Sequence, residues 1–242
     1  MKSLFNWSGG KDSALCLYHT LQQQQYQVDL LLTTLSEATS RVTMHGVRQE
    51  LLEQQAKSIG IPLQQIMLQE SPSMEAYNKL MRNTMLPLKE QGYTHAIFGD
   101  INLEDLRQYR EQQLSQIGMQ AVFPLWGKPT SELVREFIDL GFKAVVVSIN
   151  ARLLDESFVG HILDDSFIND LPAGVDPAGE NGEYHTFVFD GPIFKSPVKY
   201  TLGETVLKTY GAPADADDSC FKKEDKPAYD TGFWFCDLLP QV

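Results

Sequence analysis

The fold is decided by the stretch Leu4–Ala14, which reads LFNWSGGKDSA. Its apolar start, Leu4–Trp7, predicts a buried strand, and the apolar residues that follow the stretch recur at the spacing of one helix face. The segment Ser8–Ser13 therefore connects a strand to a helix. Two adjacent glycines let backbone N–H groups approach an anion, and the new helix directs its unpaired N–H groups at the same place. The segment predicts a phosphate-binding loop, with further donors from its two serine hydroxyls and the Lys11 ammonium.

This loop differs from two other glycine-rich phosphate motifs. The G-x-x-x-x-G-K spacing of a Walker A loop is absent, and so is G-x-G-x-x-G. Several charge-assisted hydrogen bonds together would hold a polyphosphate. The alternative is a Gly-Gly turn that is capped by serine and binds nothing.

The composition excludes several classes of protein. The chain has 242 residues, with 20 Lys+Arg against 32 Asp+Glu and a net charge of -12. Such a surface repels phosphate backbones, so we expect no nucleic-acid partner. Cys16, Cys220 and Cys236 are too few and too scattered for a disulfide framework or a zinc cluster. No signal peptide is visible and no apolar run approaches the ~20 residues of a membrane span, so we expect a soluble, cytoplasmic protein without a membrane partner.

Short apolar runs alternate with helical patterns through about the first 150 residues. The runs are nearly continuous in apolar residues, as strands covered on both faces should be. They are Leu4–Trp7, Val28–Thr34, Ile66–Leu68, His95–Phe98, Ala121–Phe123 and Lys143–Ile149. This alternation predicts an α/β fold with a doubly wound parallel sheet and helices on both of its faces.

Four helical patterns separate these runs. They cover Ala14–Leu21, Val47–Ile59, Met74–Gln91 and Leu133–Ile138. Pro87 predicts a kink or a break in the third helix. Thr130 predicts the N-cap of the fourth helix, and Gly141 predicts its end.

The alternation of strands and helices stops after about residue 150. Further along, the chain from Leu171 to Gly182 is rich in Gly, Pro and Asp and predicts an ordered loop. Three short alternating runs then predict a small antiparallel sheet: Thr186–Phe189, Val198–Leu202 and Val206–Tyr210. The acidic stretch Gly211–Tyr229 predicts a solvated loop, and Phe233–Phe235 requires burial in the core or in a homodimer. We expect one domain at residues 1–125 and a smaller α+β portion at 126–242, with a soft boundary between 125 and 150.

A second concentration of polar side chains occupies residues 179–186, which read GENGEYHT. Glu183 and His185 are two residues apart, so in an extended chain their side chains point to the same side. A carboxylate beside an imidazole can act as a base or a proton relay. The alternative is a polar turn at the start of a strand.

Together, the two motifs resemble the diphthine–ammonia ligase family of the PP-loop, or N-type ATP pyrophosphatase, superfamily. The pattern S-G-G-x-D-S after the first strand is typical of the superfamily, and G-E-x-G-E-aromatic-H-T separates this family from the rest. The resemblance runs over most of residues 3–195. It also includes Met44–Gly46, Gly60–Pro62, Phe98–Ile101, Arg110–Glu111, Pro124–Trp126, Gly174–Thr186 and Asp190–Phe194. Some relatives carry a Cys where this chain has Ala178, so thiol chemistry is not expected at that position.

The resemblance implies a Rossmann-like sheet of the PP-loop ATPase, or HUP, type with strand order 3-2-1-4-5. Ligands bind beyond the carboxyl ends of strands where such an order reverses, which would bring Asp100 beside the first loop. Asp12 and Asp100 would hold Mg²⁺ on the phosphates, although Asp100 could instead receive protons or only end a strand. The residues expected to bind ATP are Ser8, Gly9, Gly10, Lys11, Asp12, Ser13, Met44, His45 and Gly99.

The resemblance also implies a reaction, in which a carboxylate, ATP and ammonia give an amide, AMP and pyrophosphate (a ligase of EC 6.3 type). A loop that binds the departing pyrophosphate stabilises its charge and leaves the α-phosphorus open to the carboxylate. Ammonium must lose a proton before it can attack, and Glu183 or His185 is expected to take that proton. Glu180 and Asp100 complete the expected catalytic residues. The implied partners are ATP, ammonia and a carboxylate acceptor that the sequence does not identify.

Two other functions compete with this one. A tRNA-modifying PP-loop enzyme would need a basic surface and, for thiolation, a pair of cysteines. A non-enzymatic adenine-nucleotide sensor would explain the loop but would leave Glu180, Glu183 and His185 without a role. Release of pyrophosphate distinguishes an enzyme from a sensor. Arg110 and Glu111 either line the site or form an ion pair on a helix surface.

Overall fold

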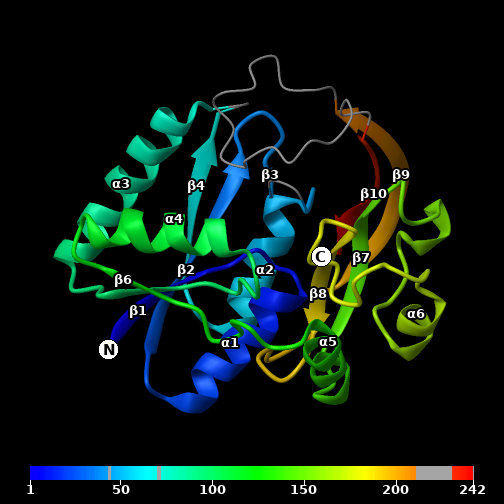
Figure 1. Cartoon of the computed structure of the whole chain (residues 1–242), viewed down its shortest axis with the longest axis horizontal. Helices are drawn as coiled ribbons and strands as arrows, with labels where there is room; N and C mark the ends of the chain where they lie inside the picture. Colours follow the sequence, from blue (N-terminus) through cyan, green and yellow to red (C-terminus); the bar gives the residue numbers. More distant parts are fainter. Residues whose placement is uncertain (43–44, 70–71, 211–230, 242) are drawn as a thin grey trace.

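The computed structural model describes residues 1–42, 45–69, 72–210 and 231–241, and two sheets organise them (Figure 1). The elements of the first sheet and its helices are β1 (Lys2–Asn6), α1 (Lys11–Gln23), β2 (Gln27–Ser36), β3 (Arg41–Val42), α2 (Gln49–Ile59), β4 (Leu63–Leu68), α3 (Met74–Glu90), β5 (His95–Ile97), α4 (Glu104–Ser115) and β6 (Gln120–Val122). They are followed by α5 (Thr130–Asp139), β7 (Lys143–Asn150), the 3₁₀ turn η1 (Glu156–Phe158), α6 (Asp165–Asp170), β8 (Tyr184–Asp190), β9 (Tyr200–Tyr210) and β10 (Thr231–Pro240).

The first sheet has the expected strand order. Its parallel strands lie in the order β4-β2-β1-β5-β6, and the two-residue β3 pairs antiparallel with the end of β2. Counted along the chain, these parallel strands are numbers 3-2-1-4-5, so the predicted order is confirmed. The order reverses between β1 and β5, and the segments after these two strands meet at the carboxyl edge of the sheet. That edge is where doubly wound sheets bind ligands.

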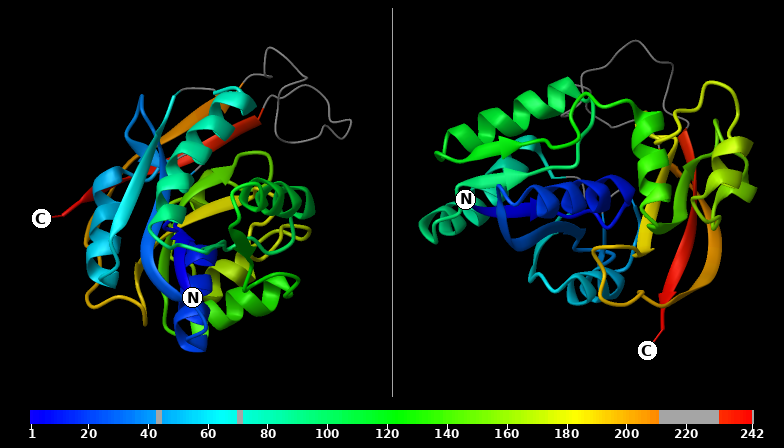
Figure 2. Two further views of the ribbon diagram at one scale, coloured as in Figure 1. Left: turned by 90° about the vertical axis from the view of Figure 1, so that its left-hand side faces the viewer. Right: turned by 90° about the horizontal axis from the view of Figure 1, so that it is seen from below.

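Helices cover both faces of this sheet, as Figure 2 shows. Successive residues of β1 point to opposite faces, so Leu4 packs in a cluster with residues of α3 and α4, while Phe5 packs with residues of α1 and α2. The cluster that contains Phe5 is the larger of the two and continues into β7 and β8. The two sheets therefore share one hydrophobic core on the side of α1 and α2. The expected division at residues 125–126 stays a prediction.

The second sheet is antiparallel, with the order β8-β7-β10-β9. The run Lys143–Ile149 is therefore not another parallel strand, because β7 pairs antiparallel with both β8 and β10. Residues 144–149 are all buried. A central antiparallel strand that is covered on both faces shows the same continuous apolar pattern as a parallel one, so the pattern alone could not distinguish the two.

The carboxyl-terminal runs are joined differently from the prediction. The run Thr186–Phe189 lies in β8, but Val198–Leu202 and Val206–Tyr210 contribute to one strand, because β10 pairs with β9 along its whole length across an irregularity between Cys236 and Leu238. Phe233–Phe235 lies in β10, between β7 and β9, and is half-buried. The predicted loop Gly211–Tyr229 falls outside the described residues, as do Met44 and Cys220.

Two predicted helix ends need correction. Helix α5 has Pro129 as its N-cap, without a side-chain hydrogen bond, and the Thr130 hydroxyl instead donates to Asp176 Oδ2 at 2.7 Å. Helix α3 continues past Pro87 to Glu90 without a break. Gly141 does follow the end of α5, with a φ of 80° that favours glycine.

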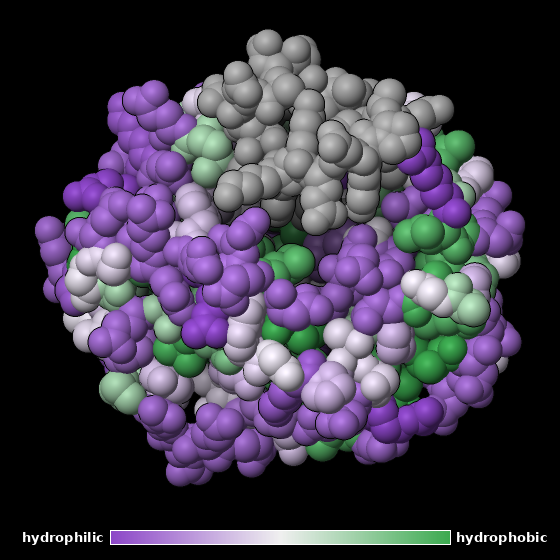
Figure 3. All heavy atoms as spheres, in the orientation of Figure 1, coloured by the Kyte–Doolittle hydropathy of each residue, from purple (hydrophilic) through white to green (hydrophobic). Residues whose placement is uncertain are grey.

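The face seen in Figure 3 is mostly hydrophilic, with small separate apolar patches. Among the described residues, no helix is both long and apolar enough to cross a membrane.

Candidate functional site

The phosphate loop, residues Ser8–Ser13, needs its first glycine. Gly9 has a φ of 81°, and a Cβ there would lie 2.6 Å from Leu52 Cδ2 and 2.8 Å from Gln55 Oε1. A Cβ on Gly10 would lie 2.9 Å from His45 Cε1 and 3.2 Å from the Thr186 carbonyl oxygen. Both glycines therefore let the loop lie against α2 and β8, which no larger residue could do without displacing them.

Buried hydrogen bonds fix the loop to the second sheet. The Gly9 carbonyl accepts from the Val188 N–H at 2.9 Å and from Gln55 Nε2 at 3.0 Å. Gln55 Nε2 also donates to the Val188 carbonyl at 2.6 Å, and its Oε1 accepts from Trp7 Nε1 at 2.9 Å. Gln55 is fully buried. The sequence analysis missed this residue, because a glutamine in a helical pattern carries no motif that distinguishes it from a surface glutamine.

The two serine hydroxyls stabilise the loop itself. Ser8 Oγ donates to Ser13 Oγ at 3.1 Å, and Ser13 Oγ donates to the Gly10 carbonyl at 2.9 Å. Both hydroxyl protons are thus used inside the loop. Their expected role as donors to a phosphate stays a prediction.

The donors that remain are one ammonium group and backbone N–H groups. Lys11 is buried, and its Nζ bonds Asp12 Oδ2 at 2.8 Å and lies 5.3 Å from the centre of the Tyr184 ring. The Lys11 N–H donates to Thr186 Oγ1 at 3.0 Å. The N–H groups of Asp12 and Ser13 belong to the first turn of α1, where a helix leaves them without a partner four residues earlier. Together with the positive end of the helix dipole, they favour an anion at this position.

The end of β5 adjoins this helix turn. A Cβ on Gly99 would lie 3.2 Å from Asp12 backbone atoms and from the Ser13 nitrogen. Asp100 follows directly, and its Oδ2 is 2.8 Å from Arg110 Nε in an ion pair. Glu111 instead pairs with Arg107 on the surface of α4. The sequence left open whether Arg110 and Glu111 line the site or form an ion pair on a helix surface. Arg110 lies at the edge of the site, whereas Glu111 lies on the surface of α4.

The second motif forms the glutamate loop, residues 176–183, in which two carboxylates hold the backbone. Glu183 is 2 % exposed, and its oxygens accept from the Asp176 N–H at 3.0 Å, the Asn181 N–H at 2.8 Å and Asn181 Nδ2 at 3.1 Å. Asp176 Oδ1 accepts from the Ala178 and Glu180 N–H groups at 2.8 and 3.4 Å. These hydrogen bonds occupy three of the about four lone-pair positions of the Glu183 carboxylate.

The third carboxylate of this loop is Glu180. Its loss of solvent, together with the negative charges of Asp12, Asp176 and Asp100, raises its pKa to about 7, while the positive charge of Lys11 opposes the rise. The charges that follow β1 and β5, at the middle of the carboxyl edge, therefore both act on Glu180. A carboxyl group that is half ionised near pH 7 can accept and return a proton at physiological pH.

Two imidazoles lie beside the phosphate loop. The ring centres of His45 and His185 are 4.6 Å apart and the rings are tilted by 32°, and His45 Nδ1 is 3.3 Å from the Thr186 carbonyl oxygen. Loss of solvent lowers the pKa of His45 to about 4, and it lowers the pKa of His185 well below its usual value with help from His45 and Lys11. Both rings are neutral at pH 7, so neither adds positive charge to the phosphate site.

An ion-pair group on β10 anchors the segment that carries His45. Asp237 Oδ1 accepts from Arg41 at 2.7 Å, and Asp237 Oδ2 accepts from Arg48 at 2.6 Å. Arg41 also donates to the Gly46 carbonyl at 2.7 Å. Burial opposes ionisation of Asp237, but the two arginines lower its pKa to about 2. These ion pairs could not be predicted from the sequence, because Asp237 lies 196 positions from Arg41 and 189 from Arg48.

No side chains in the described part of the chain form a ready metal cage. Groups of three or more His, Cys, Asp or Glu that could hold a metal ion are absent there. Mg²⁺ bound with a nucleotide needs only one or two protein carboxylates, because phosphates and waters supply its other ligands. Asp12 and Asp100 are two such carboxylates, and both raise the pKa of Glu180 by their negative charge.

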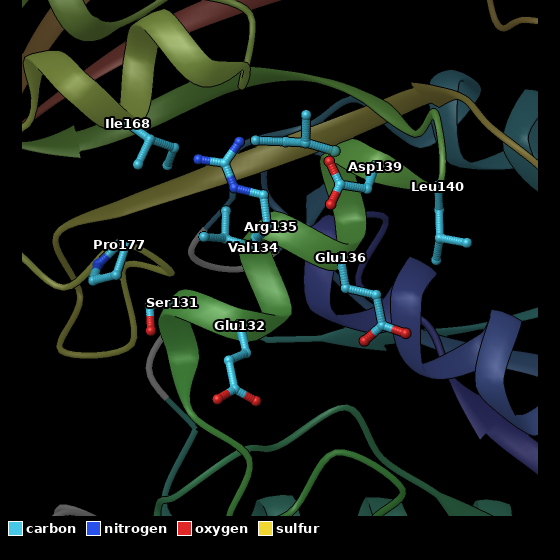
Figure 4. A pocket seen from close by; sticks show the side chains of 10 residues that line it. Ser131, Glu132, Val134, Arg135, Glu136, Asp139, Leu140, Ile168 and Pro177 are labelled. Carbon is cyan, nitrogen blue, oxygen red and sulfur yellow. The ribbon is translucent and has the colours of Figure 1, made fainter.

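Two cavities lie near the site. One of about 690 Å³ runs along α5, and Figure 4 shows its labelled side chains coming mainly from that helix, with Ile168 from α6 and Pro177 from the glutamate loop. A smaller one of about 60 Å³ lies between α3 and α4, and Arg110 and Phe98 form part of its wall. Arg110 connects the wall of this second cavity with the edge of the site, because it forms the ion pair with Asp100.

The strand order and the glycine-rich loop after β1 define a PP-loop-type α/β protein. The chain belongs to the diphthamide synthase family, whose N-terminal domain matches residues 1–121 and whose C-terminal domain matches residues 129–210. The resemblance noted in the sequence is thereby confirmed.

The curated relatives carry one name. The diphthine–ammonia ligase of Homo sapiens is 29% identical over 131 residues, which is 52% of this chain and 49% of that protein. The enzyme of the same name in Danio rerio is 28% identical over 148 residues, 57% of this chain and 58% of that protein. The diphthine–ammonia ligase of Schizosaccharomyces pombe is 26% identical over 139 residues, which is 54% of this chain and 22% of that protein. The chain thus spans about half the length of the first two relatives or a little more.

Two solved structures are similar in part. A predicted subunit of tRNA methyltransferase from Methanocaldococcus jannaschii has a TM-score of 0.42 at 20% identity and covers 61% of this chain and 80% of its own. A U34-tRNA thiolase from Methanococcus maripaludis has a TM-score of 0.34 at 15% identity. The match covers 58% of this chain and 57% of that chain. Scores at this level add nothing to the assignment of fold or function.

The role of Glu183 in holding the glutamate loop makes a stability prediction. In Glu183→Gln, one carboxylate oxygen becomes an NH₂ group that faces an N–H donor. The cost of one unsatisfied buried donor is about 1–3 kcal/mol, so the free energy of unfolding should fall by that amount in urea titrations. Both variants are compared at pH 5, where the Glu180 carboxyl is protonated in the fold. Glu180→Gln is then the matched control, since no hydrogen bond to the Glu180 carboxyl is found among the described residues. An unchanged unfolding midpoint for Glu183→Gln would contradict this structural role.

Proposed function

We propose that this protein is an ATP-dependent ligase that converts an acceptor carboxylate and ammonia into an amide, with AMP and pyrophosphate as products. The observation that carries the proposal is that a phosphate loop and a carboxyl group with a pKa near 7 meet at one sheet edge. Family membership and the name shared by the curated relatives support the same chemistry. ATP is needed because a carboxylate is a poor electrophile until its oxygen leaves as part of AMP.

The phosphate loop would bind the β- and γ-phosphates. Lys11 Nζ and the free N–H groups of the first turn of α1 would supply the donors, while the serine hydroxyls keep the loop in shape. Because these donors hold the pyrophosphate portion, they stabilise the charge that develops as the bond to the α-phosphorus breaks. The acceptor carboxylate attacks that phosphorus, pyrophosphate departs, and an acyl-adenylate is formed.

Mg²⁺ is implied by the charge of the triphosphate, and Asp12 and Asp100 are the residues that would hold it. When bound, the ion neutralises phosphate charge. Arg110 holds Asp100 in position through the 2.8 Å ion pair.

We assign the role of base to Glu180, in place of Glu183 or His185. Ammonium gives a proton to the Glu180 carboxylate, ammonia attacks the acyl carbon, and AMP leaves with the electron pair of the bond that breaks. Glu183 is less suited, because its oxygens already accept three hydrogen bonds. His185 and His45 are neutral and would instead line the nucleotide site, since His45 lies against Gly10.

The test measures products with the purified full chain. ATP, ammonium and a candidate carboxylate, beginning with a diphthine-containing protein, should give AMP and pyrophosphate in equal amounts by ³¹P NMR. An acceptor labelled with ¹⁸O in its carboxylate should pass one labelled oxygen to AMP, because that oxygen forms the bond to phosphorus. Formation of ADP and phosphate instead, or label-free AMP during amide formation, would overturn the proposal. Tight ATP binding with no turnover for any acceptor would favour the sensor.

A further inference from the structure

The outer strand of the second sheet is exposed along its length. β9 pairs with β10 on one side, and no other strand of the described chain pairs with it. Leu202, Val206 and Leu207 are 54%, 39% and 48% exposed, and they alternate between the two faces of the strand. An eleven-residue edge of this kind is a template for pairing with another strand.

The charges of β9 are arranged symmetrically. Glu204 and Lys208 are its two charged residues, and each lies two positions from Val206. Residues at even spacing share a face of a strand, so both charges lie on the same face as Val206. Lys208 Nζ is 5.4 Å from the centre of the Phe235 ring, which places it over the neighbouring β10. The strand contains no proline that would block pairing at its edge.

We propose that β9 pairs antiparallel with β9 of a second copy of this chain, joining the two four-stranded sheets across a two-fold axis at Val206. In that register Val206 faces Val206 of the partner subunit, and each Glu204 faces the partner's Lys208. Opposite residues of an antiparallel pair lie on the same face, so each pair brings a carboxylate to an ammonium group. The contact is isologous, as a two-fold dimer requires.

Other registers lose this match. A shift of the axis by one residue along the strand, to Thr205 or Leu207, places Glu204 opposite Val206 or Tyr210, and both ion pairs disappear. The aromatic run Phe233–Phe235, expected in the core or a dimer, lies on the interior strand β10 and so is not the pairing edge.

The test uses charge reversal in the full chain. Sedimentation equilibrium should show a dimer for the wild type and a dissociation constant at least about tenfold higher for Lys208→Glu, since two attractive pairs become repulsive. The double variant Glu204→Lys/Lys208→Glu exchanges the charges and should return the dissociation constant to near the wild-type value. Lys199→Glu is the matched control, with the same change in net charge outside β9. A monomeric wild type, or a Lys208→Glu dimer of unchanged affinity, would overturn the proposal.

A cysteine variant tests the register directly. In Val206→Cys the two introduced thiols face each other across the axis, within the distance that a disulfide spans, so mild oxidation should link the subunits covalently. Leu202→Cys places the thiol opposite Tyr210 of the partner subunit and should not form the link. Equal linking of both variants would overturn the register, whatever the fate of the proposed catalytic activity.

Discussion

Glu180→Gln should lower the rate of amide formation by about 10²- to 10⁴-fold while ATP affinity changes little. General-base catalysis contributes about that factor, and a neutral amide cannot take the proton from ammonium. The measurements are amide and AMP formation under saturating substrates, with ATP affinity from calorimetry. Glu183→Gln, compared at a temperature where it remains folded, should retain far more activity. Full turnover of Glu180→Gln would contradict the assignment of the base.

The same substitution should stabilise the protein above pH 7. Glu180 has its pKa raised from the ordinary 4.5 to about 7 in the fold. A raised carboxyl pKa means that stability is lost as pH rises from about 4.5 through 7, because the buried group must ionise. Removing the charge should therefore raise the unfolding temperature at pH 8 more than at pH 5. A ¹³C carboxyl resonance that titrates near pH 7 in the wild type, and is missing in Glu180→Gln, would establish the group directly.

Lys11→Ala should weaken ATP binding by about 10- to 100-fold, which corresponds to the loss of one strong charge-assisted hydrogen bond. Its ammonium is the buried cation of the phosphate loop, and it lies within reach of Asp12 and Tyr184. Without the Lys11 ammonium, only backbone N–H groups remain to bind the phosphates, and the negative charge of Asp12, which repels them, is no longer neutralised. Calorimetric titration with ATP in the presence of Mg²⁺ measures the change.

Lys2→Ala provides the matched control for this variant. Lys2 lies at the start of β1, where its ammonium is over Tyr93, and it belongs to the opposite end of the strand from the loop. Its removal should leave ATP affinity unchanged. If Lys11→Ala bound ATP as tightly as Lys2→Ala does, the phosphate loop would not be the triphosphate site.

The sequence predicted the first sheet well because local signals and topology agree there. The continuous apolar runs, the glycine loop and the helices between them all favour one parallel sheet. The second sheet was less predictable. β7 carries the pattern of a parallel strand because it is buried on both faces, and β9 appeared as two runs because Gly203 interrupts its alternation.

The candidate site shows the same division. Spacing identified the residues that the fold brings together, including Lys11, Asp100 and Glu180. It could not assign their roles, because a role depends on partners distant in the sequence. Glu183 matches the pattern of a base, but the sequence did not predict that its oxygens accept hydrogen bonds from the backbone of Asp176 and Asn181. Thr130 matched the pattern of a helix cap, yet it bonds Asp176 forty-six residues away.

The pairing of Gly9 with Val188 has a consequence for how the protein can be divided. A fragment ending after residue 128 would contain both glycines of the phosphate loop but would lack the Val188 N–H, one of the two donors to the Gly9 carbonyl. It would also leave Gln55 without one of its two acceptors and Lys11 N–H without Thr186 Oγ1. The first 128 residues therefore do not contain all the hydrogen-bond partners of the phosphate loop. Strand β8 supplies the others, so the loop would reach its final hydrogen bonding only after β8 has packed against it.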